Sequence, residues 1–276
     1  DESLDPAFRA LALELPGDDE IAREIATRGG RADPDEIHTA LAEMREMVGT
    51  RLSAEFTATY EAMAVPGPYS PDAASAGRRA LRNRCLALLT ATRDPAAFML
   101  AEAQMETAGN MSETLPALTA LVHNDAPGAQ EHLEAFQNRW QGDELVVDKW
   151  FTVQATAPLP RALTMAEALT RHPAFQWKTP NRFRSLVGAF AMANPVAFHA
   201  ADGAGYRFVA DWLLALDEVN PQTAARLAGA FESWRRYTPA RQKLMTAELR
   251  RIAAREDLSR NTREMVERIL GPDAGD

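Results

Sequence analysis

The segment Asn181-Arg-Phe-Arg-Ser-Leu-Val-Gly-Ala-Phe190 carries its large apolar residues at Phe183, Leu186, Val187 and Phe190. A spacing of i, i+3, i+4 and i+7 places such side chains on one face of an α-helix. The same period recurs at Tyr206, Val209, Leu213 and Leu216, and at Leu227, Phe231 and Trp234. The chain has no convincing run of alternating β-branched residues. We therefore predict an all-α fold with almost no strand.

Residues typical of helix N-termini divide the chain into segments of roughly 10 to 20 residues. A cap-type side chain precedes a proline at Asp5-Pro6, Asp33-Pro34, Ser70-Pro71, Asp94-Pro95, Asn194-Pro195 and Asn220-Pro221. Proline suits the first helical turn because its missing N–H would be unpaired there in any case. We predict about fifteen helices, with the segment 34–64 as the longest. They are expected to start near residues 5, 17, 33, 70, 94, 111, 127, 143, 160, 180, 194, 203, 220, 238 and 259.

Short helices joined by short turns can bury their apolar faces only against neighbouring helices. A compact multi-helix bundle and a stacked solenoid both satisfy this condition. No strict sequence period of about 34 or 40 residues is visible, so a simple repeat array is not indicated. We predict an irregular α-superhelix of HEAT/armadillo type that forms a single domain over residues 1–276.

Composition limits the possible classes of protein. With 46% hydrophobic and 25% charged residues the chain resembles ordinary globular proteins, and its net charge of −9 disfavours a general nucleic-acid binder. Cys85 heads an apolar run, so we predict a buried thiol and a reducing, cytoplasmic compartment. No stretch approaches the roughly 18 apolar residues of a membrane span. The chain begins Asp1-Glu2-Ser3-Leu4-Asp5 without an initiator Met, and we expect a piece of a longer polypeptide.

Charge is unevenly distributed along the chain. Residues 161–276 contain 17 basic and 13 acidic residues, a net charge of +4, whereas the whole chain carries −9. A solvated surface commonly varies in this way. The alternative is that the C-terminal part turns an arginine-bearing face toward an anionic group.

The residue patterns of self-sufficient catalytic sites are missing. His38, His123, His132, His172 and His199 never form the H-x-x-x-H spacing of a zinc site. The chain also lacks a G-x-S-x-G elbow, a Walker-type phosphate loop and a G-x-G-x-x-G motif. His199 is expected to cap or pack near the Asp202-Gly203 turn. We predict no catalytic and no metal-ligating residue in this chain.

Several longer blocks are more specific than these patterns. They are Gly142–Phe151, Asn181–His199, Asp202–Tyr206 and Asn220–Leu227, together with Leu81–Cys85 and Asp5–Phe8. Taken together, they resemble the C-terminal helical domain of bacterial aminopeptidase N, of the M1 family of zinc metallopeptidases. The resemblance extends to about Leu270. The family's H-E-x-x-H and G-A-M-E-N motifs are absent, which implies that the N-terminal β, catalytic and small β domains are missing here.

The resemblance implies a non-catalytic role. In that family the helical domain is an α-superhelix that packs against the catalytic domain, closes over the active site and leaves a chamber for short peptides. The zinc would then lie in the missing catalytic domain, and this chain would hold no cofactor. Its partners would be that domain and short peptides, with neither nucleic acid nor membrane. The parent protein would be a zinc aminopeptidase, and the chain alone would be inactive.

Two arginines match family positions that face the substrate chamber, namely Arg184 and Arg226. The resemblance implies that they bind the carboxylate side of a peptide, which the planar fork of a guanidinium suits. The alternative is that both form internal salt bridges between helices. Arg182 is expected to be solvated or to join two helices.

The triplet Asp148-Lys149-Trp150 is recognisable but carries no implied function. We expect Trp150 to pack on a helix face with Phe151 and Val147, and Asp148 and Lys149 to act as its cap or an ion pair. A structural role is likewise expected of Trp177, Trp212 and Trp234. A functional alternative of another class also stays open. The chain could be a standalone helical-repeat scaffold that binds proteins along a concave surface.

Overall fold

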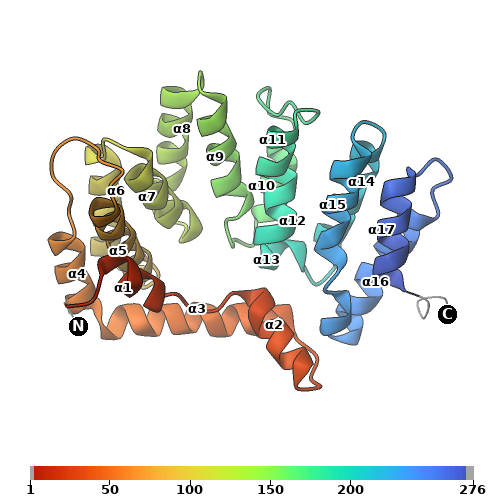
Figure 1. Cartoon of the computed structure of the whole chain (residues 1–276), viewed down its shortest axis with the longest axis horizontal. Helices are drawn as coiled ribbons and strands as arrows, with labels where there is room; N and C mark the ends of the chain where they lie inside the picture. The colour runs from red at the N-terminus through yellow and green to blue at the C-terminus, as the bar shows by residue number, and fades with distance from the viewer. Residues whose placement is uncertain (1–2, 272–276) are drawn as a thin grey trace. The chain divides into compact units, whose positions relative to one another are not determined.

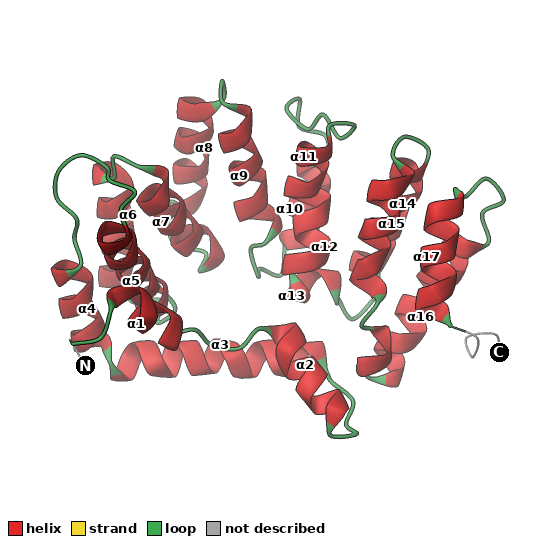
Figure 2. Ribbon diagram, viewed as in Figure 1, coloured by secondary structure: helices red, strands yellow, loops and turns green. Residues whose placement is uncertain are grey.

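The computed structural model describes residues 3–271, which form helices joined by short loops (Figure 1). No strand occurs within this range, as the colouring in Figure 2 shows. One isolated parallel bridge joins Ala32 to Tyr237. It is closed by hydrogen bonds from Ala32 N to Arg236 O (2.8 Å) and from Thr238 N to Ala32 O (3.0 Å). The prediction of an all-α fold is confirmed for the described residues.

The chain forms two compact units. The first comprises Asp1–Pro16 and Thr39–Gln141, and the second comprises Gly17–His38 and Gly142–Asp276. The helices of the first unit are α1 (Pro6–Ala12), most of α3 (Pro34–Arg51), α4 (Ser53–Ala62), α5 (Ala73–Thr90), α6 (Pro95–Thr107), α7 (Met111–His123) and α8 (Ala129–Trp140). Helix α5 is central, since α1, α4, α6 and α7 all pack against it. Cys85 on α5 is fully buried, as predicted.

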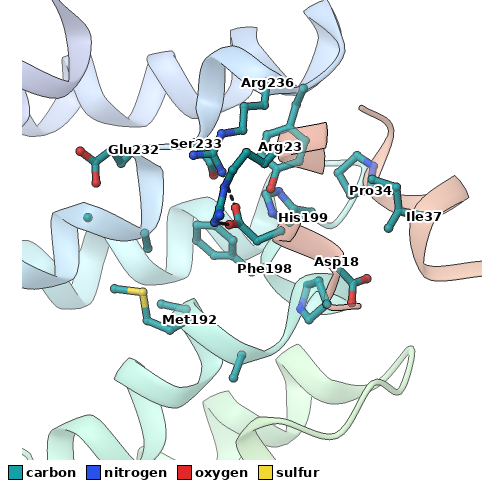
Figure 3. A pocket seen from close by; sticks show the side chains of 18 residues that line it. Asp18, Arg23, Pro34, Ile37, Met192, Phe198, His199, Glu232, Ser233 and Arg236 are labelled. Atoms are coloured by element: carbon teal, nitrogen blue, oxygen red, sulfur yellow. Dashed lines mark hydrogen bonds and ion pairs between the residues drawn. The ribbon is translucent and has the colours of Figure 1, made fainter. Parts of the chain in front are cut away.

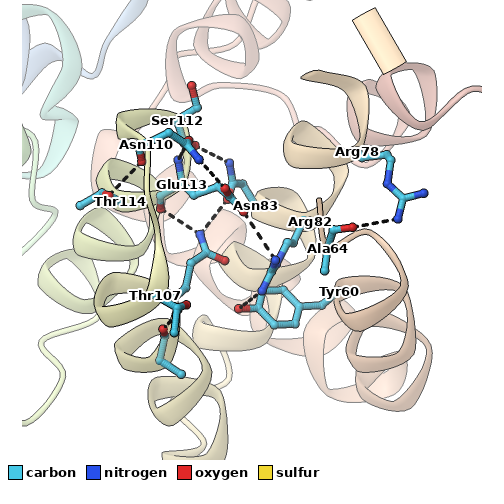
Figure 4. A network of polar contacts seen from close by, with 12 residues as sticks. Tyr60, Ala64, Arg78, Arg82, Asn83, Thr107, Asn110, Ser112, Glu113 and Thr114 are labelled. Carbon is cyan, nitrogen blue, oxygen red and sulfur yellow. Dashed lines mark hydrogen bonds and ion pairs between the residues drawn. The ribbon is translucent and has the colours of Figure 1, made fainter. Parts of the chain in front are cut away.

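A polar network crosses the first unit between its apolar contacts (Figure 4). Arg82 on α5 donates from Nη2 to the Tyr60 hydroxyl at 3.1 Å and lies 3.5 Å from Glu113 Oε1 on α7. Gln104 on α6 donates to Asn83 Oδ1 and to Glu113 O, both at 2.9 Å. Buried polar groups need such partners. The network therefore fixes four helices against one another.

The second unit contains the remaining helices. They are α2 (Asp18–Thr27), α9 (Glu144–Ala155), α10 (Ala162–Leu169), α11 (Pro180–Phe183), α12 (Ala189–Ala193), α13 (Pro195–Phe198), α14 (Ala204–Asp217), α15 (Pro221–Ala228), α16 (Pro239–Ala253) and α17 (Arg260–Leu270). A π-helical turn, Arg184–Gly188, joins α11 to α12, and short 3₁₀ turns cover Gly229–Phe231 and Trp234–Arg236. Neighbouring helices pack in succession: α9 against α10, α13 against α14, α14 against α15 and α15 against α17.

The predicted helix starts agree with the structure, each lying within about three residues of an observed start. Two details are wrong. Helix α5 begins at Ala73 and is capped by Asp72, whose side chain accepts from Ser75 N at 2.9 Å, rather than by Ser70. The segment 34–64 is two helices, because Leu52 (φ −114°, ψ 22°) separates α3 from α4.

A buried asparagine fixes the end of the helical run 180–193. Asn194 Nδ2 donates to the carbonyl oxygens of Ala155 and Ala157, both at 2.9 Å, while its Oδ1 caps α13 by accepting from Ala197 N at 3.0 Å. All three bonds lie in the core, where an unpaired amide would be costly. The end of α9 therefore holds α12 and α13 in place, and with them the segment that carries Arg184.

Candidate functional site

Arg184 and Arg226 line the same groove in the second unit. This groove has a volume of about 340 Å³ and is bordered by the π-helical turn, α12 and α15. Besides the two arginines it is lined by Phe183, Gly188, Ala189, Met192, Thr223 and Leu227. We call it the arginine groove. The structure thus brings together the two candidate residues, which lie on different helices.

Arg184 reaches this groove because of its place in the helix. Phe183 before it and Ser185 after it are buried, whereas Arg184 is exposed. Its Nη2 donates a hydrogen bond to Oδ1 of Asn181, one turn earlier. A Cβ added at Gly188, one turn later, would lie 3.5 Å from the Cβ of Arg184. Because residue 188 is glycine, this position of the π-helical turn places no side chain beside the aliphatic part of Arg184. π-helical turns are rare and often occur at functional sites.

Arg226 lies near the end of α15 and is exposed, whereas its neighbours Ala225 and Leu227 are buried. Helix α15 begins at Pro221 and is capped by Asn220, which accepts from Thr223 N at 3.1 Å. Arg226 forms no salt bridge with any described residue. Its guanidinium therefore retains all of its donors for a ligand or water.

Internal salt bridges were the alternative role for these arginines. Within residues 3–271, neither Arg184 nor Arg226 is paired with a carboxylate. Arg182 has that role instead: its Nε lies 3.1 Å from Asp148 Oδ1, and its guanidinium lies 5.2 Å from the centre of the Phe151 ring. Of the two expectations for Arg182, the inter-helix contact is confirmed and solvation is wrong.

The remaining recognisable residues are structural. Trp150 is buried, with its ring centroid 4.9 Å from that of Phe151 and 5.2 Å from that of His172. Trp212 lies between Phe175 and Trp177, and Trp234 Nε1 donates to Ile269 O at 3.0 Å. Asp148 forms the expected ion pair. Lys149 forms none with the described residues, so that part of the prediction is wrong.

A larger cavity of about 570 Å³ lies in the same unit (Figure 3), and Met192 lines both it and the arginine groove. Both arginines that line it are paired with Asp19, which accepts from Arg23 at 2.8 Å and from Arg236 at 2.6 Å. Two further carboxylates, Asp18 and Glu232, also line the cavity. Because both arginines are already paired, this cavity offers no unpaired guanidinium to a carboxylate ligand.

His199 lines the larger cavity but does not cap the Asp202-Gly203 turn. It is buried, its Nδ1 lies 2.6 Å from the Tyr206 hydroxyl, and its ring packs 4.4 Å from that of Tyr237. Asp202 caps α14 itself by accepting from Ala204 N at 2.9 Å. Burial, reinforced by Arg241, lowers the pKa of His199 to about 3. The imidazole is thus a neutral packing group at physiological pH.

Residues 3–271 contain no group of three or more His, Cys, Asp or Glu side chains that could hold a metal ion. His38, His172 and His199 lie in the second unit, and His123 and His132 in the first. In the same part of the chain, none of the helices combines the length and apolar character needed to cross a membrane.

Comparison with known proteins places these features in a family. A family model described as "Domain of unknown function (DUF3458_C) ARM repeats" matches residues 1–271. Aminopeptidase N of Caulobacter vibrioides is 41% identical over 273 residues, which are 98% of this chain and 31% of that protein. Aminopeptidase N of Escherichia coli is 36% identical over 274 residues, with 98% and 30% covered. The armadillo-repeat description agrees with the predicted superhelix.

A solved structure shows the same fold. The crystal structure of Legionella pneumophila aminopeptidase A in complex with aspartic acid matches with a TM-score of 0.87 and 28% identity, over 98% of this chain and 32% of that one. The chain thus spans less than a third of the length of these relatives.

Proposed function

We propose a function from the premise that this chain belongs to the DUF3458_C family of ARM-repeat domains and is the C-terminal domain of aminopeptidase N-like proteins. In this proposal the domain packs against the catalytic domain of the same polypeptide, caps its active site and limits access to short peptides. The intact protein releases N-terminal amino acids from those peptides, and the helical domain shapes the chamber without taking part in the chemistry.

The single observation that carries the proposal is the pair of uncompensated guanidiniums in the arginine groove. A guanidinium without a protein counter-ion attracts an anion, and a carboxylate can accept two parallel N–H bonds from it. The C-terminal carboxylate of a short peptide is such an anion. Arg184 and Arg226 would hold this end while the N-terminal end lies at the catalytic domain.

Zinc enters the proposal only through the catalytic domain of the aminopeptidase N relatives. The described residues of this chain do not fit a zinc site, since no suitable group of ligands is present among them. No step of the proposal therefore runs through a metal held here. The role of this chain is to bind and orient the far end of the peptide.

Replacing Arg184 in the complete aminopeptidase tests the proposal. Arg184→Ala should lower kcat/KM about tenfold or more for peptides with a free C-terminal carboxylate, because a charge-assisted contact is lost. Alanyl anilides lack that carboxylate and should be cleaved almost as before. Equal losses on both substrates would contradict the proposal and make Arg184 a structural residue.

Arg207→Ala is the matched control. Arg207 lies on α14 in the same unit and is exposed, and it does not line the arginine groove. Its removal deletes the same charge from the surface of the unit, so it should leave the rates on both substrates unchanged. A loss on peptides equal to that of Arg184→Ala would show that only net charge matters.

The standalone scaffold makes a different prediction. If the chain acts alone, an antibody against it should detect a native protein of about 30.3 kDa without peptidase activity. Our proposal predicts a native protein about three times larger that coelutes with alanyl-anilide hydrolysis, in keeping with the 31% of the Caulobacter relative that the chain covers. It also predicts no such hydrolysis by the isolated chain.

A further inference from the structure

We infer that the arginine groove selects peptides whose C-terminal residue carries an apolar side chain. This inference rests on the proposed function, because it assumes that the two arginines hold the C-terminal carboxylate. It adds the side-chain specificity of that subsite.

The inference rests on the side chains that line the groove. Apart from the two arginines and Thr223, the lining consists of Phe183, Gly188, Ala189, Met192 and Leu227, none of which has a polar side chain. Apart from the two arginines, the Thr223 hydroxyl is the one lining side-chain group that could replace the hydrogen bonds to water of a polar side chain that entered. Leaving a desolvated polar group unpaired is unfavourable, whereas covering an apolar side chain is favourable.

The floor and the rim of the groove differ in rigidity. Phe183 and Leu227 are 1% and 4% exposed, so they form a fixed apolar floor that belongs to the core. Met192 on α12 is 58% exposed and forms the open rim. Methionine is unbranched and polarizable, so it adapts to apolar side chains of different shapes. Met192 is therefore the residue that can close over an apolar C-terminal side chain.

An acidic C-terminal residue is the strongest competitor, because a second carboxylate could also bind the arginines. Two observations disfavour it. Arg184 already donates one N–H to Asn181 Oδ1, which reduces the donors left for two carboxylates. The groove contains no further cation, so the second charge would lie against Met192, Ala189 and the apolar floor. Charged groups are costly in such surroundings unless they are paired.

Three blocked peptides test the inference on the 276-residue chain. They are acetyl-Gly-Gly-Leu, acetyl-Gly-Gly-Asp and the C-terminal amide of acetyl-Gly-Gly-Leu. Each is titrated into ¹⁵N-labelled protein while NMR follows the backbone amides around the groove and the arginine Nε–H groups. NMR detects binding at millimolar peptide. We expect the Leu acid to bind at least about fivefold more tightly than the Asp acid, and the amide about tenfold more weakly than the Leu acid.

The variant Met192→Gln tests the preference for an apolar C-terminal side chain separately from carboxylate binding. The substitution keeps an unbranched side chain but makes the rim polar, so the preference for Leu over Asp should fall to about twofold or less. Met99→Gln is the matched control, because Met99 is also exposed, at 66%, but lies on α6 in the first unit. It should leave the preference unchanged.

The outcomes separate the two claims. Equal or tighter binding of the Asp acid overturns the inference and leaves the carboxylate role of the arginines intact. An amide that binds as tightly as the acid overturns that carboxylate role, and the inference with it. Absence of any perturbation around the groove at millimolar peptide also overturns both.

Discussion

Arg182 and Asp148 join α11 to α9 through an ion pair, with Nε 3.1 Å from Oδ1. Both side chains are largely buried, at 9% and 18% exposed. Arg184, only two residues further along, is exposed and lines the arginine groove. Residues i and i+2 do not face each other on a helix. The two arginines therefore point to opposite sides, one holding helices together and the other available to a ligand.

Asp148→Ala should lower the free energy of unfolding by about 3 kcal/mol, because it leaves a buried guanidinium without its counter-ion. The Nη1 atom of Arg182 is already buried without a hydrogen-bond partner, so the site has no spare acceptor. Urea unfolding followed by circular dichroism measures the change. Arg184→Ala is the control and should shift stability by less than about 0.5 kcal/mol. If the two variants lose the same stability, the ion pair does not stabilise the fold.

Gly205→Ala should be strongly destabilising. Gly205 lies in the first turn of α14, where an added Cβ would overlap the Ala197 carbonyl oxygen and lie 2.5 Å from that of Phe198. The backbones of α13 and α14 would have to separate, at a cost of about 2–3 kcal/mol.

Gly188→Ala is the matched substitution in the π-helical turn. Its added Cβ would meet the Arg184 Cβ at 3.5 Å, an ordinary contact. Since alanine favours helix over glycine, stability should stay unchanged or rise by up to about 1 kcal/mol. Thermal melts of both variants give the comparison. A Gly205→Ala protein as stable as Gly188→Ala would show that α13 and α14 are not held at this close approach.

Stability should depend on pH through His199. Burial and Arg241 lower its pKa from 6.5 to about 3, although Asp18 and Asp19 act in the opposite direction. The unfolded chain therefore binds a proton near pH 6.5 that the folded chain does not bind until about pH 3. The contribution of His199 is complete above pH 6.5 and is lost as the pH falls, by up to about 2 kcal/mol between pH 7 and pH 5.

His199→Gln isolates this contribution. Urea unfolding at pH 7, 6 and 5 should give a shallower pH dependence for the variant than for the parent protein, whatever the baseline stability of the variant. Partial burial also lowers the pKa of His172, but that residue is present in both proteins and cancels in the comparison. Identical slopes would mean that His199 is protonated equally in the folded and unfolded states.

Helix boundaries were predictable because capping is local. Asp5 accepts from Ala7 N and Asp94 from Ala96 N, each at 2.8 Å, within one turn of the proline that follows the cap. The prediction failed where two caps competed, since Asp72 rather than Ser70 starts α5. It also failed at Leu52, where the chain turns without a glycine or proline to mark the break.

The all-α character of the chain and the starts of its helices follow from local sequence, because apolar periodicity and capping depend on residues within a few positions of one another. The resemblance indicated Arg184 and Arg226 as candidates but left open whether they pair with carboxylates inside the fold. The folded structure shows that Arg182, and not Arg184, pairs with Asp148, and that Arg184 shares a groove with Arg226. These outcomes depend on contacts between residues far apart in the chain, which local patterns do not encode.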